Sequence, residues 1–299
     1  MQKASIKVPA TTANMGPGFD CLGMALDIWN TVEIEVGGSG IEITGQGSND
    51  LPKNHSNLVY QSFSQIYNIL GKSPPSALLR CHNEIPLDRG MGSSAAAVVA
   101  GLLLANTVSG SHFTSGQLLD IAAEIEGHPD NVAPAILGGC QIVVKDHDVL
   151  VTSHVPLPND LKTVLFIPNT PMPTSEARSV LSSEISREDA VFNISRAALL
   201  VHALAVGDLK HLAIATDDKM HQPARQSVFY PMKNIFRAAM DAGALGVFLS
   251  GSGSTVLALT IDRAFTIGYE MADAAAKSGL GGEIKVSKPT PSGAYVLQQ

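Results

Sequence analysis

The 299-residue chain is predicted to fold as an α+β protein with two domains. At this length, a hydrophobic content of 45% suffices for two cores of ordinary size. Strands and helices alternate in the second half of the chain, which favours a two-layer sandwich of sheet and helices. Between the halves, Pro156-Leu157-Pro158-Asn159-Asp160 has two prolines and few groups able to pair, which is typical of a linker. We therefore expect domains at residues 1–157 and 158–299.

Hydrophobic periodicity predicts the elements of the first domain. Apolar and polar residues alternate on both sides of Gly37–Gly40, which predicts a β-hairpin. Helical spacing begins after Ser56 or Asn57, either of which can cap the helix, and Thr114 and Gln117 have the spacing of a capping box. The expected elements are strands at Ser5–Val8, Thr31–Val36, Ile41–Thr44 and Ala77–His82, helices at Leu58–Leu70, Gly92–Ser109 and Thr114–Glu126, and a hairpin of Gly139–Val144 with Leu150–Val155.

The same patterns predict the elements of the second domain. Thr174 and Asp262 are expected to cap the helices that begin beside them. Gly251, Ser252 and Gly253 form a glycine turn between two buried strands. The expected elements are strands at Thr163–Ile167, Val256–Ile261, Glu283–Ser287 and Tyr295–Leu297, and helices at Asp189–Ala205, Leu209–Thr216 and from Asp262 to Lys277.

Charge and composition exclude several classes of function. The formal net charge of −7 argues against a nucleic-acid partner, which needs a clustered excess of Lys and Arg. Residues Met1–Lys7 lack the apolar core of a signal peptide, and the longest apolar run, Ala95–Ala105, is shorter than the roughly 20 residues that span a bilayer. We expect a cytoplasmic protein without a membrane partner. Cys21, Cys81 and Cys140 are widely spaced, which indicates buried free thiols.

A glycine- and serine-rich loop precedes the apolar helix that begins near residue 92. Glycines let a backbone approach a ligand, and the free N–H groups of a helix start attract an anion, so the loop suits a phosphate. No Gly-Lys-Ser/Thr follows, which excludes a Walker A loop, and His-Arg-Asp and Asp-Phe-Gly are absent from the sequence. Gly90, Gly92 and Ala95 match G-x-G-x-x-A, but the polar segment Asn83–Arg89 separates them from the preceding strand. A dinucleotide site and a helix cap without ligand stay as minor alternatives.

Two further segments carry polar side chains in suggestive patterns. A carboxylate, an imidazole, another carboxylate and an amide emerge together at a helix end, at Glu126, His128, Asp130 and Asn131, which suits a metal site or an acid/base pair. Oxygen ligands together with a phosphate favour Mg²⁺ over zinc. The loop Pro9–Asp20 carries amide and carboxylate side chains, which on spacing alone serve to bond the turn backbone. His202, His211 and His221 show no ligand spacing and are expected to be structural.

The string Pro-x-x-x-Gly-x-Gly-Ser-Ser-Ala-Ala resembles the ATP-binding loop of the GHMP kinases, which phosphorylate galactose, homoserine, mevalonate and phosphomevalonate. The resemblance covers nearly the whole chain. It implies an N-terminal ATP-binding domain related to ribosomal S5 domain 2, a ferredoxin-like C-terminal domain, and a site between them. The residues that it assigns to ATP are Pro86, Leu87, Asp88, Arg89, Gly90, Met91, Gly92, Ser93, Ser94, Ala95, Ala96, Gly251, Ser252 and Gly253.

The other motifs are similar to those of the family members that phosphorylate L-homoserine. The resemblance implies that Mg²⁺ is bound by Ser94 and by a helix-end glutamate, Glu126 or Glu124, with Glu126 favoured. Arginines suit the carboxylate of an amino acid, which galactose lacks. Where mevalonate kinases have an Asp base, this chain has an amide that cannot take a proton. The residues implied to bind or process the acceptor are Asn14, Asp20, His128, Asn131, Thr174, Arg178 and Arg225.

The activity implied by the resemblance is transfer of the ATP γ-phosphoryl group to the side-chain hydroxyl of L-homoserine, which yields O-phospho-L-homoserine for threonine biosynthesis. Phosphoryl transfer depends mostly on positioning and charge neutralisation, and the motifs supply both. The alternatives are a GHMP kinase for another small alcohol and a catalytically inactive relative that senses a ligand. The expected partners are ATP and L-homoserine, and a homodimer is left open.

Overall fold

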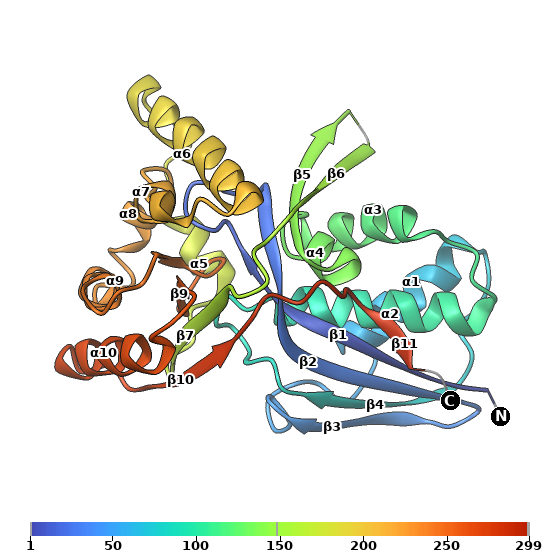
Figure 1. The fold of residues 1–299 in the computed structure, drawn as a ribbon. Helices are drawn as coiled ribbons and strands as arrows, with labels where there is room; N and C mark the ends of the chain where they lie inside the picture. The colour runs from blue at the N-terminus through green and yellow to red at the C-terminus, as the bar shows by residue number, and fades with distance from the viewer. Residues whose placement is uncertain (1, 148, 298–299) are drawn as a thin grey trace.

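The computed structural model describes residues 2–147 and 149–297 and contains two sheets with their helices (Figure 1). The elements up to residue 155 are β1 (Lys3–Ala13), β2 (Leu22–Val36), β3 (Gly40–Gly45), α1 (Leu58–Ile69), β4 (Ala77–Asn83), α2 (Ser93–Ser109), α3 (Ser115–Glu126), α4 (Val132–Leu137), β5 (Cys140–Asp146) and β6 (Val149–Val155). Those that follow are β7 (Lys162–Pro168), α5 (Thr174–Ser179), α6 (Arg187–Val206), η1 (Leu209–His211), α7 (Leu212–Ala215), α8 (Gln222–Arg225), α9 (Met232–Asp241), β8 (Gly246–Leu249), β9 (Val256–Thr260), α10 (Ala264–Lys277), β10 (Gly282–Ser287) and β11 (Tyr295–Leu297).

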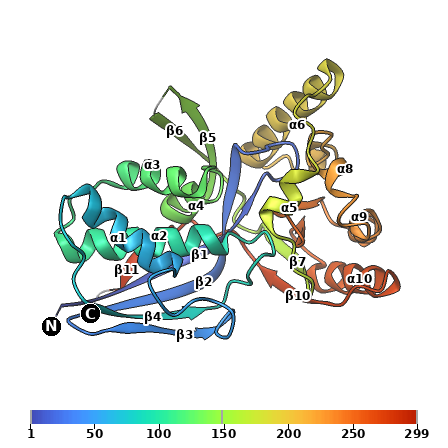
Figure 2. The same ribbon diagram turned by 180° about the vertical axis from the view of Figure 1, so that it is seen from behind.

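The first sheet has the strand order β11-β1-β2-β4-β3, with β5 paired to β2 and β6 to β5. Helices α1 to α4 lie on one face of this sheet in both ribbon views (Figures 1 and 2). Helix α2 is apolar on nearly all sides, and Val98, Val99 and Leu104 are fully buried. A helix without a polar face packs in the interior. Its N-terminus is thereby fixed against the sheet, and this is where the glycine-rich loop ends.

The predicted hairpin between Thr31–Val36 and Ile41–Thr44 is wrong. Both strands form, but β4 lies between them, antiparallel to β2 and parallel to β3. Alternating apolar and polar residues fix which face of a strand is buried and do not select its neighbour. Leu79 and Cys81 of β4 are buried and occupy the position next to β2. The glycine segment serves as a crossing between non-adjacent strands.

The second sheet has the order β10-β7-β9-β8, and α9 and α10 pack against it. Buried Val164, Phe166 and Ile267 belong to its core. The predicted strands of this sheet are confirmed. The two predicted helix caps are wrong, because α5 is preceded by Pro173 and α10 by Arg263, and neither helix has a side-chain cap. The two sheets with their helices form the two-domain α+β architecture that the sequence predicted, and the boundary at 157/158 stays a prediction.

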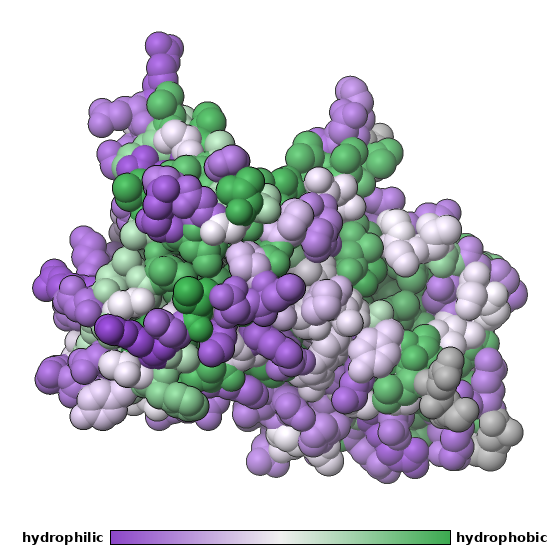
Figure 3. Space-filling view, in the orientation of Figure 1, coloured by the Kyte–Doolittle hydropathy of each residue, from purple (hydrophilic) through white to green (hydrophobic). Residues whose placement is uncertain are grey.

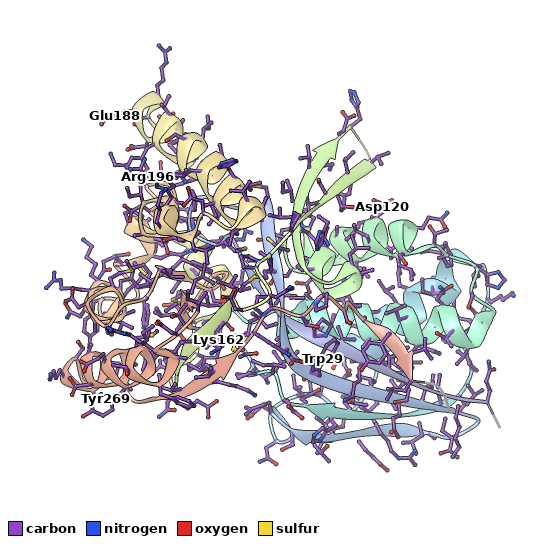
Figure 4. All side chains as sticks on the ribbon, viewed as in Figure 1. Trp29, Asp120, Lys162, Glu188, Arg196 and Tyr269 are labelled. Carbon is purple, nitrogen blue, oxygen red and sulfur yellow. The ribbon has the colours of Figure 1, made fainter. Side chains whose placement is uncertain are left out.

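The segment after β10 returns to the first sheet. The strand expected at Tyr295–Leu297 forms, but it pairs antiparallel with β1 and does not extend the second sheet. The ring of Trp29, labelled on β2 in Figure 4, packs edge-on against Tyr295 with 5.6 Å between ring centroids. The last strand forms the edge of the first sheet, beside β1. The two domains are therefore connected by the chain twice.

Two projections rise from the molecule, α6 and the hairpin β5–β6 (Figure 1). Both carry exposed apolar side chains, visible as green atoms in Figure 3; they include Val191 and Ile194 of α6 and Val144, Val149 and Val151 of the hairpin. Among the described residues, α6 is the one helix long and apolar enough to cross a membrane by length and composition, which alone is weak evidence.

The cysteines agree with the expectation of free thiols. Cys81 and Cys140 are buried, Cys21 is partly buried, and none forms a disulfide. Burial raises the pKa of the Cys81 thiol to about 11. Such a thiol is protonated at neutral pH and is a poor nucleophile.

Candidate active site

A cavity of about 560 Å³ lies where the glycine-rich loop, the start of α2 and the end of α3 meet segments of the second sheet and its helices. Every residue of the predicted ATP loop, from Pro86 to Ala96, lines it. The remaining predicted site residues that line it are Asn14, Glu126, His128, Asn131, Thr174, Arg178, Arg225, Gly251 and Ser252. Asp20, Glu124 and Gly253 do not belong to the lining. The cavity thus brings together side chains from motifs far apart in the sequence.

The glycines of the loop are required by its conformation. Gly90 has φ of 71°, and a Cβ atom there would lie 2.0 Å from the Ser250 carbonyl oxygen. Gly92 has φ of 69° and precedes α2 directly; its Cβ atom would lie 1.9 Å from Thr11 Oγ1. Only glycine tolerates both a left-handed φ and such close contacts. The loop is therefore pressed against β1 and the Ser250–Ser254 turn, and the first N–H groups of α2 open into the cavity.

Arg89 serves a different purpose from the one expected of a cation in a phosphate loop. Its Nε donates to the Pro168 carbonyl oxygen at 2.6 Å, and its Nη2 donates to the carbonyl of Asn169. Its Nη1 donates to the Leu87 carbonyl oxygen at 2.9 Å. These bonds use the guanidinium to hold the ATP loop against the end of β7. Arg89 lines the cavity, but its donors face the protein.

Ser94 and Glu126 form the part of the site that suits a metal. The Ser94 hydroxyl donates to Glu126 Oε1, and burial raises the pKa of the Glu126 carboxyl. Glu124 lies two residues earlier in α3; it is exposed and does not line the cavity. No group of three or more His, Cys, Asp or Glu side chains that could hold a metal is found among residues 2–147 and 149–297. One carboxylate and one hydroxyl fit Mg²⁺, which binds through few protein ligands together with phosphate oxygens and water.

His128 and Asn131 are fixed by neighbouring polar groups. The ring nitrogen Nδ1 of His128 lies 2.9 Å from Asp130 Oδ1, and this hydrogen bond raises the pKa of His128. The Oδ1 atom of Asn131 accepts from Thr11 Oγ1 at 2.7 Å, and its Nδ2 donates to Asp130 Oδ1 at 3.4 Å. The Asp130 carboxylate therefore orients the imidazole that lines the cavity.

The loop before β2 is held in a left-handed conformation at three residues that are not glycine, Asn14, Met15 and Asp20. Asn14 has φ of 65° and Asp20 has φ of 56°. Asn14 Oδ1 accepts from the Asp20 N–H at 2.9 Å, and Asn14 Nδ2 donates to the Gly251 carbonyl oxygen at 2.8 Å. The amide therefore bonds the turn and also lines the cavity. The two interpretations of this loop in the sequence are compatible.

Two arginines approach the cavity near this loop. Arg178 donates from Nη2 to Asp20 Oδ1 at 2.6 Å and from Nη1 to Oδ2 at 3.1 Å, a bidentate pair. Arg225 is 1% exposed and donates from Nε to the Ala177 carbonyl oxygen at 3.2 Å and from Nη1 to the Gly251 carbonyl oxygen at 3.0 Å. Both guanidinium groups lie over the ring of Phe19, at 5.5 and 5.7 Å from its centroid. Their positive charges are thus concentrated at one end of the cavity.

His221 holds the Arg225 guanidinium in place by a hydrogen bond. Its Nδ1 accepts from Arg225 Nη1 at 2.8 Å, and its Nε2 donates to the Gly16 carbonyl oxygen at 2.8 Å. Burial lowers the pKa of His221 to about 4, so the ring is neutral at pH 7. The expectation that this histidine is structural agrees with its full burial. Burial also lowers the pKa of Arg225, to about 10, which leaves the guanidinium charged at neutral pH.

Thr174 and the glycine turn close the same end. Thr174 Oγ1 lies 3.2 Å from Ser252 Oγ, so the start of α5 and the turn after β8 are in contact. Gly253 has φ of 96°, and a Cβ atom there would lie 2.2 Å from Met172 Cε. Although it does not line the cavity, Gly253 permits this close packing.

The sequence analysis missed the amides at the opposite end. Asn30, Asn57 and Asn83 line the cavity together with apolar Leu51 and Val59. Asn57 was identified only as a helix cap, and it does accept from the Val59 N–H at 3.0 Å. Asn30 Oδ1 accepts from the backbone N–H groups of residues 84 and 85, which fixes the start of the ATP loop. Isolated asparagines in strands give no sequence signal for such roles.

The fold and this cavity define a class of small-molecule kinase, and comparison with known proteins agrees. The family model described as GHMP kinases N terminal domain matches residues 57–139, and the one described as GHMP kinases C terminal matches residues 200–274. The chain belongs to the GHMP kinase family and is an ATP-dependent kinase with an alcohol acceptor.

Several proteins similar to this chain over nearly its whole length are named homoserine kinase. The homoserine kinase of Moorella thermoacetica is 43% identical over 293 residues, which cover 98% of this chain and 99% of that protein. The homoserine kinase of Trichormus variabilis is 40% identical over 284 residues, 94% of each chain. The crystal structure of homoserine kinase from Cytophaga hutchinsonii superimposes with a TM-score of 0.89 at 30% identity and covers 99% of this chain and 98% of that one.

Proposed function

We propose that this protein phosphorylates the side-chain hydroxyl of L-homoserine with ATP and so forms O-phospho-L-homoserine for threonine biosynthesis. The observation that carries the proposal is the set of charges at one end of the cavity. Arg178 and Arg225 line this end and supply two guanidinium groups, and Asp20, which is bonded to Arg178 but lies outside the lining, supplies one carboxylate. Such a set matches an α-amino acid, because arginines bind a carboxylate and an aspartate binds an ammonium group. The similarity to homoserine kinases supports L-homoserine as this amino acid.

ATP is proposed to bind with its phosphates on the glycine-rich loop and its base toward the end lined by Leu51, Asn57 and Val59. Backbone N–H groups at the start of α2 then face the phosphate oxygens. Ser94 and Glu126 would hold Mg²⁺, which supplies positive charge that neutralises the phosphates during transfer. This assignment favours Glu126 over Glu124, because only Glu126 lies in the cavity.

The acceptor is proposed to lie between the ATP loop and the charged end. Asp20 would accept from its ammonium group, and Arg178 and Arg225 would bind its carboxylate. His128 and Asn131 lie on the α3 side of the cavity, where they can orient the hydroxyl by hydrogen bonds. The Asn131 amide cannot take a proton, which leaves His128, whose pKa is raised by the hydrogen bond to Asp130, as the candidate base of the two. In a loose transition state the hydroxyl proton leaves late, and the γ-phosphate can accept it.

The wider context follows from the same proposal. A biosynthetic enzyme of this kind works in the cytoplasm on small molecules, and the formal net charge of −7 gives no support to a nucleic-acid partner. A homodimer is compatible with the proposal.

The test is ADP release by the purified protein with ATP, Mg²⁺ and each of L-homoserine, mevalonate and galactose, with the product identified by ³¹P NMR. We expect turnover with L-homoserine at least a hundredfold above that with the other two. Turnover confined to another alcohol would support the first alternative function. ATP binding without ADP release from any alcohol would support a ligand-sensing protein.

A further inference from the structure

Asp218 lies between α7 and α8, outside the lining of the cavity, and its side chain is fully buried. Its Oδ2 accepts from the N–H groups of His221 and Gln222, at 3.0 and 2.7 Å. Its Oδ1 accepts from the Met220 N–H at 2.8 Å and from Nδ2 of Asn193, on α6, at 2.6 Å. A buried carboxylate is unfavourable unless donors satisfy its oxygens, and here four of them do. Asp218 is therefore held rigidly, although it lies outside the proposed site of reaction.

The first consequence concerns the short helix that carries Arg225. Helix α8 has four residues, Gln222–Arg225, and Arg225 is the last of them. The first N–H groups of a helix have no partner within it, and a carboxylate that precedes the helix can accept from them. Asp218 does so at the start of α8. The direction in which the Arg225 side chain leaves the backbone therefore depends on Asp218.

The second consequence concerns the ring of His221. Its Nε2 lies 2.8 Å from the Gly16 carbonyl oxygen and 3.6 Å from Asp218 Oδ2. A neutral imidazole has one N–H, and two acceptors that face Nε2 hold the proton there. The lone pair of Nδ1 then accepts from Arg225 Nη1, 2.8 Å away. The Asp218 carboxylate thus favours the tautomer of His221 that can hold this arginine.

These contacts decide which donor of Arg225 is left for a ligand. Its Nε donates to the Ala177 carbonyl oxygen, and its Nη1 donates to the Gly251 carbonyl oxygen as well as to His221. Among residues 2–147 and 149–297, none accepts from its Nη2, and Arg225 lines the cavity. A proton on His221 Nδ1 would face Nη1 and turn the guanidinium away from this orientation.

We propose that Asp218 is a positioning residue for the acceptor. It does not touch the substrate. It holds Arg225 through the start of α8 and through the tautomer of His221, so that Nη2 of the arginine meets the carboxylate of the acceptor. The inference rests on the proposed function and adds to it a residue outside the cavity that sets the affinity for homoserine and leaves that for ATP unchanged.

The tautomer of His221 can be measured in the parent protein by long-range ¹H–¹⁵N correlation NMR of the histidine side chains at pH 7. The signals of His221 are those that disappear in His221→Gln. We expect a neutral ring with its proton on Nε2. A proton on Nδ1 would overturn the inference without any change at Asp218.

The effect on the acceptor is measured as KM in the ADP-release assay. Asp218→Asn should raise the KM for homoserine about tenfold and change that for ATP less than about twofold. Asn193→Ala is a milder variant, which removes one bond to Asp218 and should raise the KM for homoserine about threefold. Asp217→Asn is the matched control: it removes the same charge from the neighbouring residue, which is exposed and whose side chain bonds none of the described residues. It should leave both KM values unchanged.

A double-mutant cycle separates positioning from a merely structural role. If Asp218 acts through Arg225, Asp218→Asn should change the KM for homoserine less than about twofold once Arg225→Met has removed the guanidinium. An equal effect in both backgrounds, or an unchanged KM in every variant that folds, would overturn the inference. The thermal midpoint and the KM for ATP report folding. Failure of the proposed function is read separately, as absence of ADP release by the parent protein with L-homoserine, and the NMR measurement does not depend on it.

Discussion

Replacing His221 by Gln should remove an acid-sensitive contribution to stability. His221 is fully buried, and its Nδ1 accepts a hydrogen bond from the positively charged Arg225. A proton on Nδ1 would face that donor directly. Burial and Arg225 lower the pKa of His221, whereas Asp218 and Asp20 raise it, and the net result is a pKa of about 4. The folded protein therefore retains His221 in its neutral form.

The magnitude follows from the difference between the folded and the unfolded pKa. In the unfolded chain the ring has its ordinary pKa of about 6.5, so below this pH the unfolded state binds the proton more tightly. Stability is fully present above pH 6.5 and falls as the pH decreases toward the folded pKa of about 4. Between pH 7 and pH 5 the loss amounts to about 2 kcal/mol, and at pH 4 it approaches about 3 kcal/mol.

Urea unfolding followed by circular dichroism at pH 7 and pH 5 measures this effect. The parent protein should lose about 2 kcal/mol more over this interval than His221→Gln, because carboxylates titrate equally in both. His202→Gln is the control, since His202 is exposed on α6. An equal loss in the parent and in His221→Gln would refute the argument that a neutral ring between Arg225 and the Gly16 carbonyl is needed.

Three further changes have distinct expected results. Gly90→Ala should lower the thermal midpoint and raise the KM for ATP, because its Cβ atom would lie 2.0 Å from a backbone carbonyl oxygen; Gly71→Ala, with an equally positive φ but open space, should cost far less. Glu126→Gln should lower kcat about a hundredfold or more and raise the Mg²⁺ requirement, whereas equal rates in Glu126→Gln and Glu124→Gln would contradict the metal assignment. Arg225→Lys should raise the KM for homoserine about tenfold with the KM for ATP unchanged, and equal effects on both would place the arginine elsewhere.

Local chemistry explains the elements that the sequence predicted correctly. The capping box of Thr114 and Gln117 is present as expected, and Asn57 caps α1. These signals lie within one helical turn and include a side-chain bond back to the backbone, whereas the single-residue caps expected at Thr174 and Asp262 do not form. Partner choice between strands is different. The position of β4 between β2 and β3, and of β11 on β1, depends on which sheet edges the rest of the fold leaves free.

The candidate active site likewise contains features that depend on local sequence and features that depend on distant segments. The ATP loop could be predicted because its glycines and serines are adjacent in sequence. The supporting contacts of Arg225 could not, because His221, Ala177 and Gly251 come from separate segments. The left-handed conformation of Asp20 likewise depends on a hydrogen bond to Asn14 that no spacing rule announces. The assignments of individual residues to ATP, metal and acceptor stay predictions until they are measured.

The pairing of β11 with β1 has a consequence for the newly made chain. At about 5 to 20 residues per second, the ribosome needs on the order of 10 to 30 s to proceed from the end of the first domain to β11. During this time one edge of β1 has no strand beside it, and open edges invite pairing with other chains. Lys3, Lys7 and Pro9 lie on β1, and charged residues and proline are what discourage such contacts. The lysines and the proline of β1 thus protect its free edge from pairing with other chains until β11 has been synthesised.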